Sequence, residues 1–427
     1  MTREPTAASL VAEGFSRIAD AVGIVLLGVL GSRMFFVFDS ALQGSALFVG
    51  LIGLLACWTD RSAKKDAPLA MLAYVAIGLL SAAVHRWSTV AATPEPAWLS
   101  LFSSASHLAV MAVFIYGAAY LLRSTSRLSW FVIVMVASIG VLAAQIAFDR
   151  ASTGFVYVRG GPSLASVPHW GGIHGASLFL TMALPLIAAI GLAGRYPARV
   201  LAAIIAATGF LVVEFLNGSR GGLVAMASVI AAMLLFATLS RRRPRPRAWT
   251  LWSAVAALSL GSVLLVWLQR AAVEGGENLS GRIFIWGGTA RLVLDHPWLG
   301  VGPGNFAQAI ADSDHAAFYL AHYGGLHNAH NMYLHVAAEA GVLGALCLSA
   351  FLAWSLGACW RSWMRGSAPI VSLGIMFSLL GLVVHSASEN FLDARAEVER
   401  TRLLVWMVLA AACALQRLPR AYSVQRT

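Results

Sequence analysis

Repeated apolar runs constrain this chain more than any other sequence feature. Each run covers roughly 17 to 22 residues, and a helix of that length crosses about 30 Å of hydrocarbon. Hydrophobic residues make up 59% of the 427 residues and charged residues 11%, which leaves too little polar surface for a water-soluble globule. We therefore expect an all-α integral membrane protein with about twelve transmembrane helices, at roughly 21–38, 42–58, 68–84, 99–122, 129–147, 175–193, 200–216, 222–239, 249–268, 332–358, 369–388 and 402–416.

The basic residues at the joints between these runs predict a topology. They fall in alternate loops, which the positive-inside rule makes cytoplasmic together with both termini. The net charge of +11 is then mainly an orientation signal, and residues 241–247 are interpreted as a stop-transfer anchor, not as a nucleic-acid patch. The other basic positions are Arg61, Lys64, Lys65, Arg123, Arg127, Arg195, Arg199, Arg361, Arg365, Arg417, Arg420 and Arg426.

The chain is expected to form a single membrane domain over residues 1–427, without a cleavable signal peptide, because its first apolar run has the length of a span. The cysteines fall in or at the ends of predicted helices, in no metal spacing, which argues against a disulfide framework and against a zinc site. The longest polar stretch, about 269–331, is predicted to be a large loop on the outer side that carries part of a functional site.

This outer loop has internal order. Residues 280–294 mix apolar side chains with two arginines in a pattern that favours a short helix lying on the membrane, and His296-Pro297 ends it. The glycines of residues 300–305 favour sharp turns. Because no strand precedes them, they are only a weak signal for phosphate binding.

Three arginines on the outer side are candidates for binding an anion. Arg220 lies in the turn 217–222 between two spans, and Arg282 and Arg291 lie in the outer loop. A guanidinium fork matches phosphate oxygens, and a charge beside the membrane is costly without a partner or a function. Alternatives stay open: Arg220 could snorkel to the interface or pair with Glu214, and the other two could hold lipid headgroups.

Histidines cluster where the outer loop enters the tenth predicted span. If residues 330–341 are helical, His335 and Glu339 share a face and His330 lies near the helix start. A histidine there can exchange protons near neutral pH and activate a hydroxyl. The competing metal site lacks the His-Glu-x-x-His spacing of zinc hydrolases, and interfacial hydrogen bonding is a further alternative.

Several short motifs follow one another in a particular order. They are Ser-Arg-Gly within 217–222, Ser280-Gly281-Arg282 with Trp286, the run from His296 to Phe306, and His330-Asn331-x-Tyr333-Leu334 with Glu339-x-Gly341. Each motif is loose alone, but the ordered set resembles the O-antigen ligase and polymerase superfamily. The resemblance spans roughly residues 200–390, and the single large loop before the tenth span agrees with it.

The resemblance implies a bacterial inner-membrane glycosyltransferase with a periplasmic active site, no metal and no other cofactor. Its donor would be O-antigen polysaccharide on undecaprenyl diphosphate, and its acceptor a sugar hydroxyl of lipid A-core, both reached among membrane lipids. His330 matches the family's general base, and Arg220 and Arg282 match arginines thought to hold the diphosphate. Arg291 is added from its charge and location. Supporting residues are expected to be Asn331, Tyr333, Glu339 and His327.

The chemistry of the residues agrees with this implication. Departure of a lipid diphosphate needs little acid assistance, but fixed cations must meet its growing negative charge, and arginines supply them. A base opposite the leaving group would deprotonate the acceptor hydroxyl for in-line attack and invert the anomeric centre.

Two other functions stay open at this point. A polymerase or protein O-oligosaccharyltransferase of the same superfamily would share the donor and differ in the acceptor. Protein-glycosylating relatives usually carry a longer soluble C-terminal region, and chain length and loop placement favour the ligase over the polymerase. A transporter of an anionic solute would place ionisable residues deep in several spans, whereas here they gather at one outer surface.

Overall fold

The computed structural model describes residues 17–26, 42–60, 68–89, 97–152, 172–193, 197–239, 277–313, 328–392 and 399–418, and this part of the chain contains no strand. Residues 17–26 are helical. The labelled helices are α2 (Leu42–Thr59), α3 (Leu69–Thr89), α4 (Ala97–Leu121), α5 (Thr125–Ser152), α6 (Gly172–Ala193), α7 (Pro197–Asn217), α8 (Arg220–Leu239), α10 (Glu277–Asp295), α11 (Phe306–Ala311), α13 (Met332–Arg365), α14 (Pro369–His385) and α15 (Glu399–Leu415).

These helices occupy every predicted span that the described residues cover. The predicted span 249–268 and most of 21–38 lie outside the described residues. Three described helices have both the length and the hydropathy of a membrane span: Thr125–Ser152, His174–Gly191 and Met332–Arg365. The all-helical class is therefore confirmed for the described residues, whereas the count of twelve spans and the periplasmic loop stay predictions.

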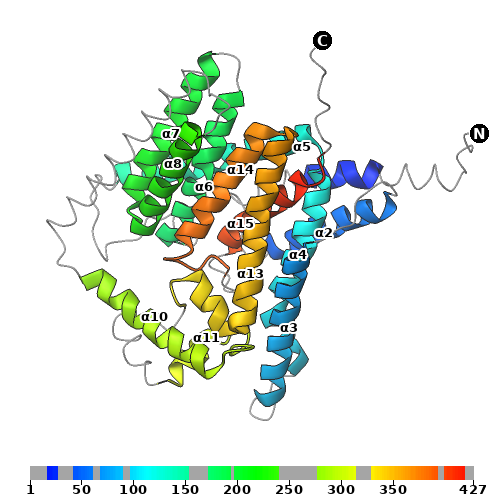
Figure 1. Ribbon diagram of the computed structural model, residues 1–427, viewed down its shortest axis with the longest axis vertical. Helices are drawn as coiled ribbons and strands as arrows, with labels where there is room; N and C mark the ends of the chain where they lie inside the picture. Colours follow the sequence, from blue (N-terminus) through cyan, green and yellow to red (C-terminus); the bar gives the residue numbers. More distant parts are fainter. Residues whose placement is uncertain are drawn as a thin grey trace, which may run out of the picture.

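Two helices form the centre of the bundle, because they are apolar all round and not on one face only. In α6, 89% of the His174–Gly191 window is buried, against 39% for the corresponding window of α5. In α15, every residue from Leu403 to Leu415 is buried. Helix α14 packs on α6, α8 and α13, and α15 packs on α4, as the arrangement in Figure 1 also shows.

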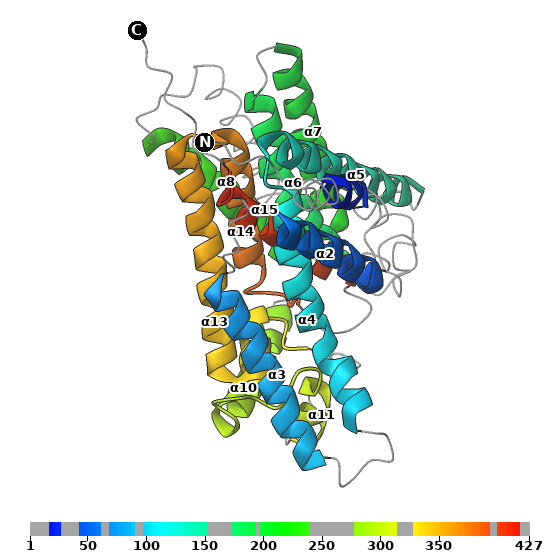
Figure 2. The same cartoon turned by 90° about the vertical axis from the view of Figure 1, so that its right-hand side faces the viewer.

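A second group of elements lies around the N-terminal end of α13. Figures 1 and 2 show α10 and α11 together beside this end, away from α7. These elements contact one another through a separate apolar cluster, which consists of Ile285, Leu292, Val301, Phe306, Ile310, Ala329 and Ala338. We call residues 277–313 with the first turns of α13 the outer unit. A helix over the predicted range 280–294 is observed as α10, and it ends at Asp295, before His296-Pro297 as expected; its position on the membrane stays a prediction.

The outer unit is joined to α13 at a break in that helix. Gly341 has φ 72° and ψ 176°, a backbone conformation reserved for glycine, so carbonyls and amides around it lose their helical partners. The glycine run supplies replacements. Val301 N donates to the Ala338 carbonyl at 2.8 Å, Gly302 N to the Glu339 carbonyl at 2.9 Å, and Val342 N to the Pro297 carbonyl at 2.8 Å. The glycine run therefore forms the turn that holds the outer unit against α13. This agrees with the turns that the sequence predicted for these glycines.

Gly341→Ala should destabilise the protein strongly. A Cβ at this position would lie 2.0 Å from the Trp298 carbonyl oxygen, and the positive φ adds strain. We expect a cost of about 2–5 kcal/mol, the sum of a glycine-only backbone and an overpacked contact, measured as a lower Tm of the detergent-purified protein. Gly209→Ala is the matched control, because a Cβ there meets nothing within 4 Å. Equal Tm values for the two variants would contradict the docking role.

Candidate active site

The predicted base and one predicted arginine meet at a buried carboxylate. Glu389 lies in the short segment after α14, and its side chain is 6% exposed. His330 Nδ1 lies 3.0 Å from Glu389 Oε2, and Arg282 Nη2 donates to Glu389 Oε1 at 2.7 Å. Arg282 Nη1 also donates to the Ser388 carbonyl at 2.6 Å. The side chains of Arg282 and His330 are partly exposed, 25% and 28% respectively, so a substrate can reach them, unlike the buried carboxylate.

A second histidine completes this cluster. His174, in the first turn of α6, places Nδ1 3.3 Å from Glu389 Oε1 and 3.3 Å from Ser219 Oγ. Because Ser219 precedes Arg220, His174 connects the buried carboxylate to the turn that carries the second predicted arginine. We call Glu389, His330, Arg282 and His174 the polar cluster.

The charge of Glu389 is set by these neighbours. Burial by itself would raise the pKa of the carboxyl, because it disfavours the ionised form. His174, His330 and Arg282 outweigh burial and lower the pKa of Glu389 to about 2. The group is therefore a carboxylate at neutral pH. Arg282 contacts the Glu389 carboxylate directly. The carboxylate therefore binds a guanidinium group, whereas in a metal site it would have to serve as a ligand of the metal.

The backbone at His330 is strained. His330 has φ 45°, the only positive φ of a non-glycine residue among those described, and such conformations cost about 1–3 kcal/mol and concentrate at functional sites. Its backbone N–H donates to Asn328 Oδ1 at 2.7 Å, which helps hold this conformation. The following residue, Asn331, caps α13 by accepting from Tyr333 N and Leu334 N, both at 3.0 Å.

The segment around His330 is tied to the segment that precedes Glu389. Asn331 Nδ2 donates to the Ala387 carbonyl at 3.1 Å, Met332 N to the Ser386 carbonyl at 2.9 Å, and the Tyr333 hydroxyl to the Val383 carbonyl at 3.0 Å. These bonds set the distance between the His330 ring and the Glu389 carboxylate. Asn331 and Tyr333 thus lie where they can orient the histidine.

The turn between α7 and α8 lies against the polar cluster. Gly218 has φ 79° and ends α7, as expected from the sequence. A Cβ on Gly221 would lie 2.5 Å from Ser388 Oγ and 3.4 Å from His385 Nε2, so only glycine permits this approach. Arg220, the first residue of α8, has an exposed side chain. The turn therefore carries Arg220 to the edge of the polar cluster.

One alternative from the sequence was that Glu214 forms an ion pair with Arg220. The contacts of Glu214 in the structure do not support this alternative. It is fully buried, and the Ser177 hydroxyl donates a hydrogen bond to its carboxyl. A Cβ on Gly222 would lie 2.3 Å from Glu214 Oε1, so Glu214 packs under the turn and braces it against α6.

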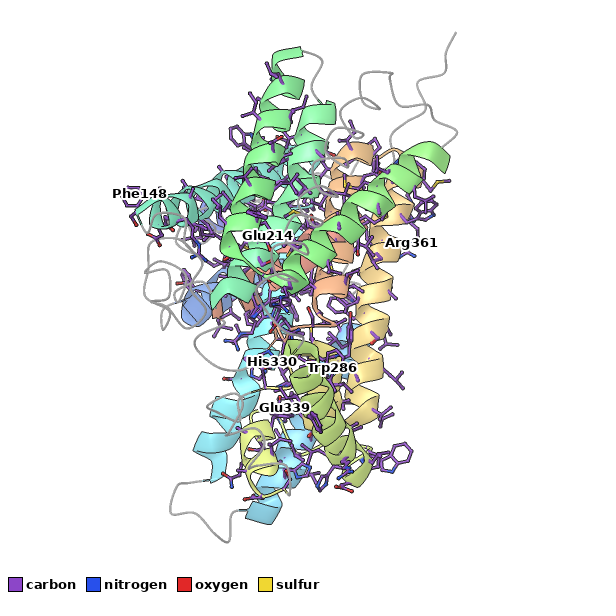
Figure 3. The ribbon with its side chains drawn as sticks, turned by 90° about the vertical axis from the view of Figure 1, so that its left-hand side faces the viewer. Phe148, Glu214, Trp286, His330, Glu339 and Arg361 are labelled. Atoms are coloured by element: carbon purple, nitrogen blue, oxygen red, sulfur yellow. The ribbon has the colours of Figure 1, made fainter. Side chains whose placement is uncertain are left out.

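Glu339 lies in the outer unit. Its Oε1 accepts from Gly304 N at 2.8 Å and lies 3.4 Å from His335 Nε2, so these two residues share a helix face as predicted. The carboxylate thus holds the glycine run in place. In Figure 3 the labelled Glu339 lies on the far side of His330 from Glu214.

The structure does not bring Arg291 to the polar cluster. It follows Arg282 by nine residues in α10, which is about 13 Å along the axis and two and a half turns of helix. The two arginines therefore point to opposite faces, and Arg291 is exposed. His327, the remaining predicted supporting residue, lies outside the described residues.

Glu389 and His174 were missed by the sequence analysis as site residues. The available signals were weak: a polar run, residues 386–390, that interrupts an apolar segment, and one ionisable residue at the edge of an apolar span, which is expensive without a function. Neither residue is near His330 in the sequence, so only the packing of α6 and α14 brings them to it.

A bundle of apolar helices with an ionised cluster at one end defines a membrane protein with an enzyme-like polar site. Residues 202–349 match the model of a family described as O-antigen ligase, and this match supports membership of the O-antigen ligase and polymerase superfamily. The matched segment includes Arg220, Arg282 and His330 but neither His174 nor Glu389. No curated protein matches the sequence. Membership implies an enzyme of the glycosyltransferase type that acts on lipid-linked saccharides.

The low pKa of Glu389 predicts a pH-dependent stability. Its native value of about 2 lies below the ordinary 4.5, so the ionised group stabilises the fold fully above pH 4.5 or so, and this contribution is lost as the pH falls toward 2. Glu389→Gln should therefore lower Tm most at neutral pH, with a gap to wild type that narrows over this acid window. The Tm of both proteins, measured at a series of pH values, tests this prediction. Asp295→Asn, which changes an exposed carboxylate of α10, should show no such gap, and a constant gap for Glu389→Gln would refute an ionised Glu389.

Proposed function

We propose that this protein is an O-antigen ligase, which transfers O-antigen polysaccharide from undecaprenyl diphosphate to a sugar hydroxyl of lipid A-core at the periplasmic face of the inner membrane. The family match supports an enzyme of this superfamily. The observation that carries the mechanism is the 3.0 Å contact between His330 Nδ1 and Glu389 Oε2.

This contact prepares His330 to act as a general base. A proton on Nδ1, shared with the carboxylate, leaves the lone pair on Nε2. Nε2 then takes the proton of the acceptor hydroxyl, and the buried Glu389 stabilises the imidazolium that forms, as an acidic residue does in other histidine-based sites. Glu389 is thus a positioning residue, and the strained backbone of His330 fixes the direction of the ring.

The hydroxyl oxygen forms a bond to the anomeric carbon while the bond from that carbon to the diphosphate oxygen breaks. The electron pair leaves with undecaprenyl diphosphate, and the proton stays on His330 until it is released to solvent. Attack from the side opposite the leaving group inverts the anomeric centre. No metal and no cofactor enter this step.

Arginines meet the charge of the departing diphosphate. Arg220 is exposed at the start of α8, where the amides of the helix N-terminus also favour an anion. Arg282 uses two of its five N–H donors on Ser388 and Glu389, and the others are available for phosphate oxygens. Arg291, on the opposite face of α10, has no part in this proposal.

His330→Ala should leave the protein inserted and folded but lower transfer by about 10²- to 10⁴-fold, the usual contribution of a general base. The assay is reconstitution with undecaprenyl-diphosphate-linked O-antigen and purified lipid A-core. His296→Ala is the control, because His296 is an exposed histidine of the outer unit. Transfer at the wild-type rate in His330→Ala would end the assignment, and chain growth on the donor itself without lipid A-core would point to a polymerase.

Arg220→Lys should lower turnover about tenfold, because an ammonium loses at least one charge-assisted hydrogen bond worth about 1.5 kcal/mol of transition-state stabilisation. Arg291→Gln, measured in the same assay, should change turnover less than twofold if only the face of α10 that carries Arg282 meets the substrate. The reverse ranking of the two variants would show that the diphosphate lies along the opposite face of α10.

A further inference from the structure

A cavity lies at the other end of α13, far from the polar cluster. Its volume is about 310 Å³, and it is formed by α3, α4, α13, α15 and the residues that follow α15. Helix α13 begins beside His330 and reaches this cavity with Arg365 in its last turn. Figure 3 shows the same separation between the labelled His330 and Arg361, one turn before Arg365. The cavity therefore does not belong to the proposed transferase site.

The cavity contains cationic and amide donors that lack acceptors within the described residues. Arg365 and Arg417 both line it, together with Gln416. Arg417 stacks on the Tyr116 ring at 4.6 Å, but its Nη1 is buried without a hydrogen-bond partner, and so is Nε2 of Gln416. Leaving buried donors unpaired is costly, and more so for a charged group. None of the described residues that line this cavity is acidic, so the donors have no anion among them.

Two other arginines, which follow α4 in the chain, have an acidic partner within the described residues. Arg123 and Arg127 both bind the buried carboxylate of Asp20, at 2.7 and 2.6 Å. Asp60 contacts Tyr120, which is itself close to Arg417. Asp60 accepts a hydrogen bond from the Tyr120 hydroxyl at 2.6 Å, and it does not line the cavity. Among the described residues, one pair of arginines thus has an internal anion, whereas no carboxylate lines the cavity beside Arg365 and Arg417.

The remaining walls of the cavity are apolar or aromatic. Met71 and Ile115, which are both buried, line it together with Trp354 and Tyr116. Aromatic side chains of this kind favour the level of lipid headgroups. The end of the bundle that holds Arg365 and Arg417 is also the end predicted to be cytoplasmic. A site with paired cations above apolar walls, at the surface of a membrane protein, matches an amphipathic anion.

We propose that this cavity binds the headgroup of an anionic phospholipid, with its phosphate between Arg365 and Arg417 and the start of its acyl chains against Met71 and Ile115. The buried Arg417 Nη1 and Gln416 Nε2 then gain acceptors that they lack among the described residues. The lipid is a structural ligand that ties the end of α13 to α15, and the site is independent of the proposed transfer reaction.

The test measures lipid preference with the full chain in detergent micelles. Binding of phosphatidylglycerol and of phosphatidylcholine is compared by native mass spectrometry at equal mole fraction. Each arginine beside an anionic lipid contributes about fivefold, so wild type should prefer phosphatidylglycerol by about 25-fold. Arg365→Gln should reduce this preference about fivefold, and Arg365→Gln with Arg417→Gln should remove it.

Controls separate this site from general charge effects. Arg365 is exposed, so Arg365→Gln should fold even if the double variant does not. Arg361→Gln removes an exposed charge one turn earlier that does not line the cavity, and it should keep the wild-type preference. Unchanged preference in Arg365→Gln, or equal loss in Arg361→Gln, overturns the proposal. So does full competition by glycerol 3-phosphate or inorganic phosphate at millimolar concentration, which would indicate a site for a soluble anion.

Discussion

The buried carboxylate of Glu389 is the interaction on which the rest of the site depends. An ionised group taken out of water costs several kcal/mol unless close partners compensate for it, and here the partners come from α6, α10 and the segment before α13. Each of them is partly exposed, whereas the carboxylate is not. One buried negative charge therefore holds three side chains from distant parts of the chain in a single cluster.

Two backbone features make this arrangement rigid. The positive φ of His330 and the cap at Asn331 direct the imidazole toward Glu389, and hydrogen bonds to residues 383–387 hold the two segments together. The break at Gly341 lets the glycine run dock on α13 and so positions the outer unit. Because α10 belongs to that unit, the position of Arg282 depends on the break at Gly341, ten residues after the helix cap Asn331. Function and fold are thus coupled through backbone hydrogen bonds as much as through side chains.

Much of this could be read from the sequence. Apolar runs predicted the helices, and short motifs singled out His330, Arg282 and Arg220, because chemistry of this kind needs particular residue types beside irregular backbone. The glycine run was correctly interpreted as turns. Glu339 was predicted to support the site, and in the structure its carboxylate accepts a hydrogen bond from Gly304 N. Arg291 was grouped with Arg282 by charge alone, although helix geometry directs the two to opposite faces. Glu389 and His174 went unassigned as site residues, since nothing local distinguishes one acidic or one basic residue at the end of a span.

The sequence by itself determined the helical membrane class, the positions of most helices and the residues able to exchange protons or bind phosphate. These properties depend on hydropathy, turn chemistry and side-chain type, all of which are local. Only the tertiary structure decided which of those residues meet. The contact between His330 and Glu389 spans 59 residues of the chain, and His174 comes from still farther away. Such pairings depend on how α6, α13 and α14 pack, and that packing is a property of the whole buried surface.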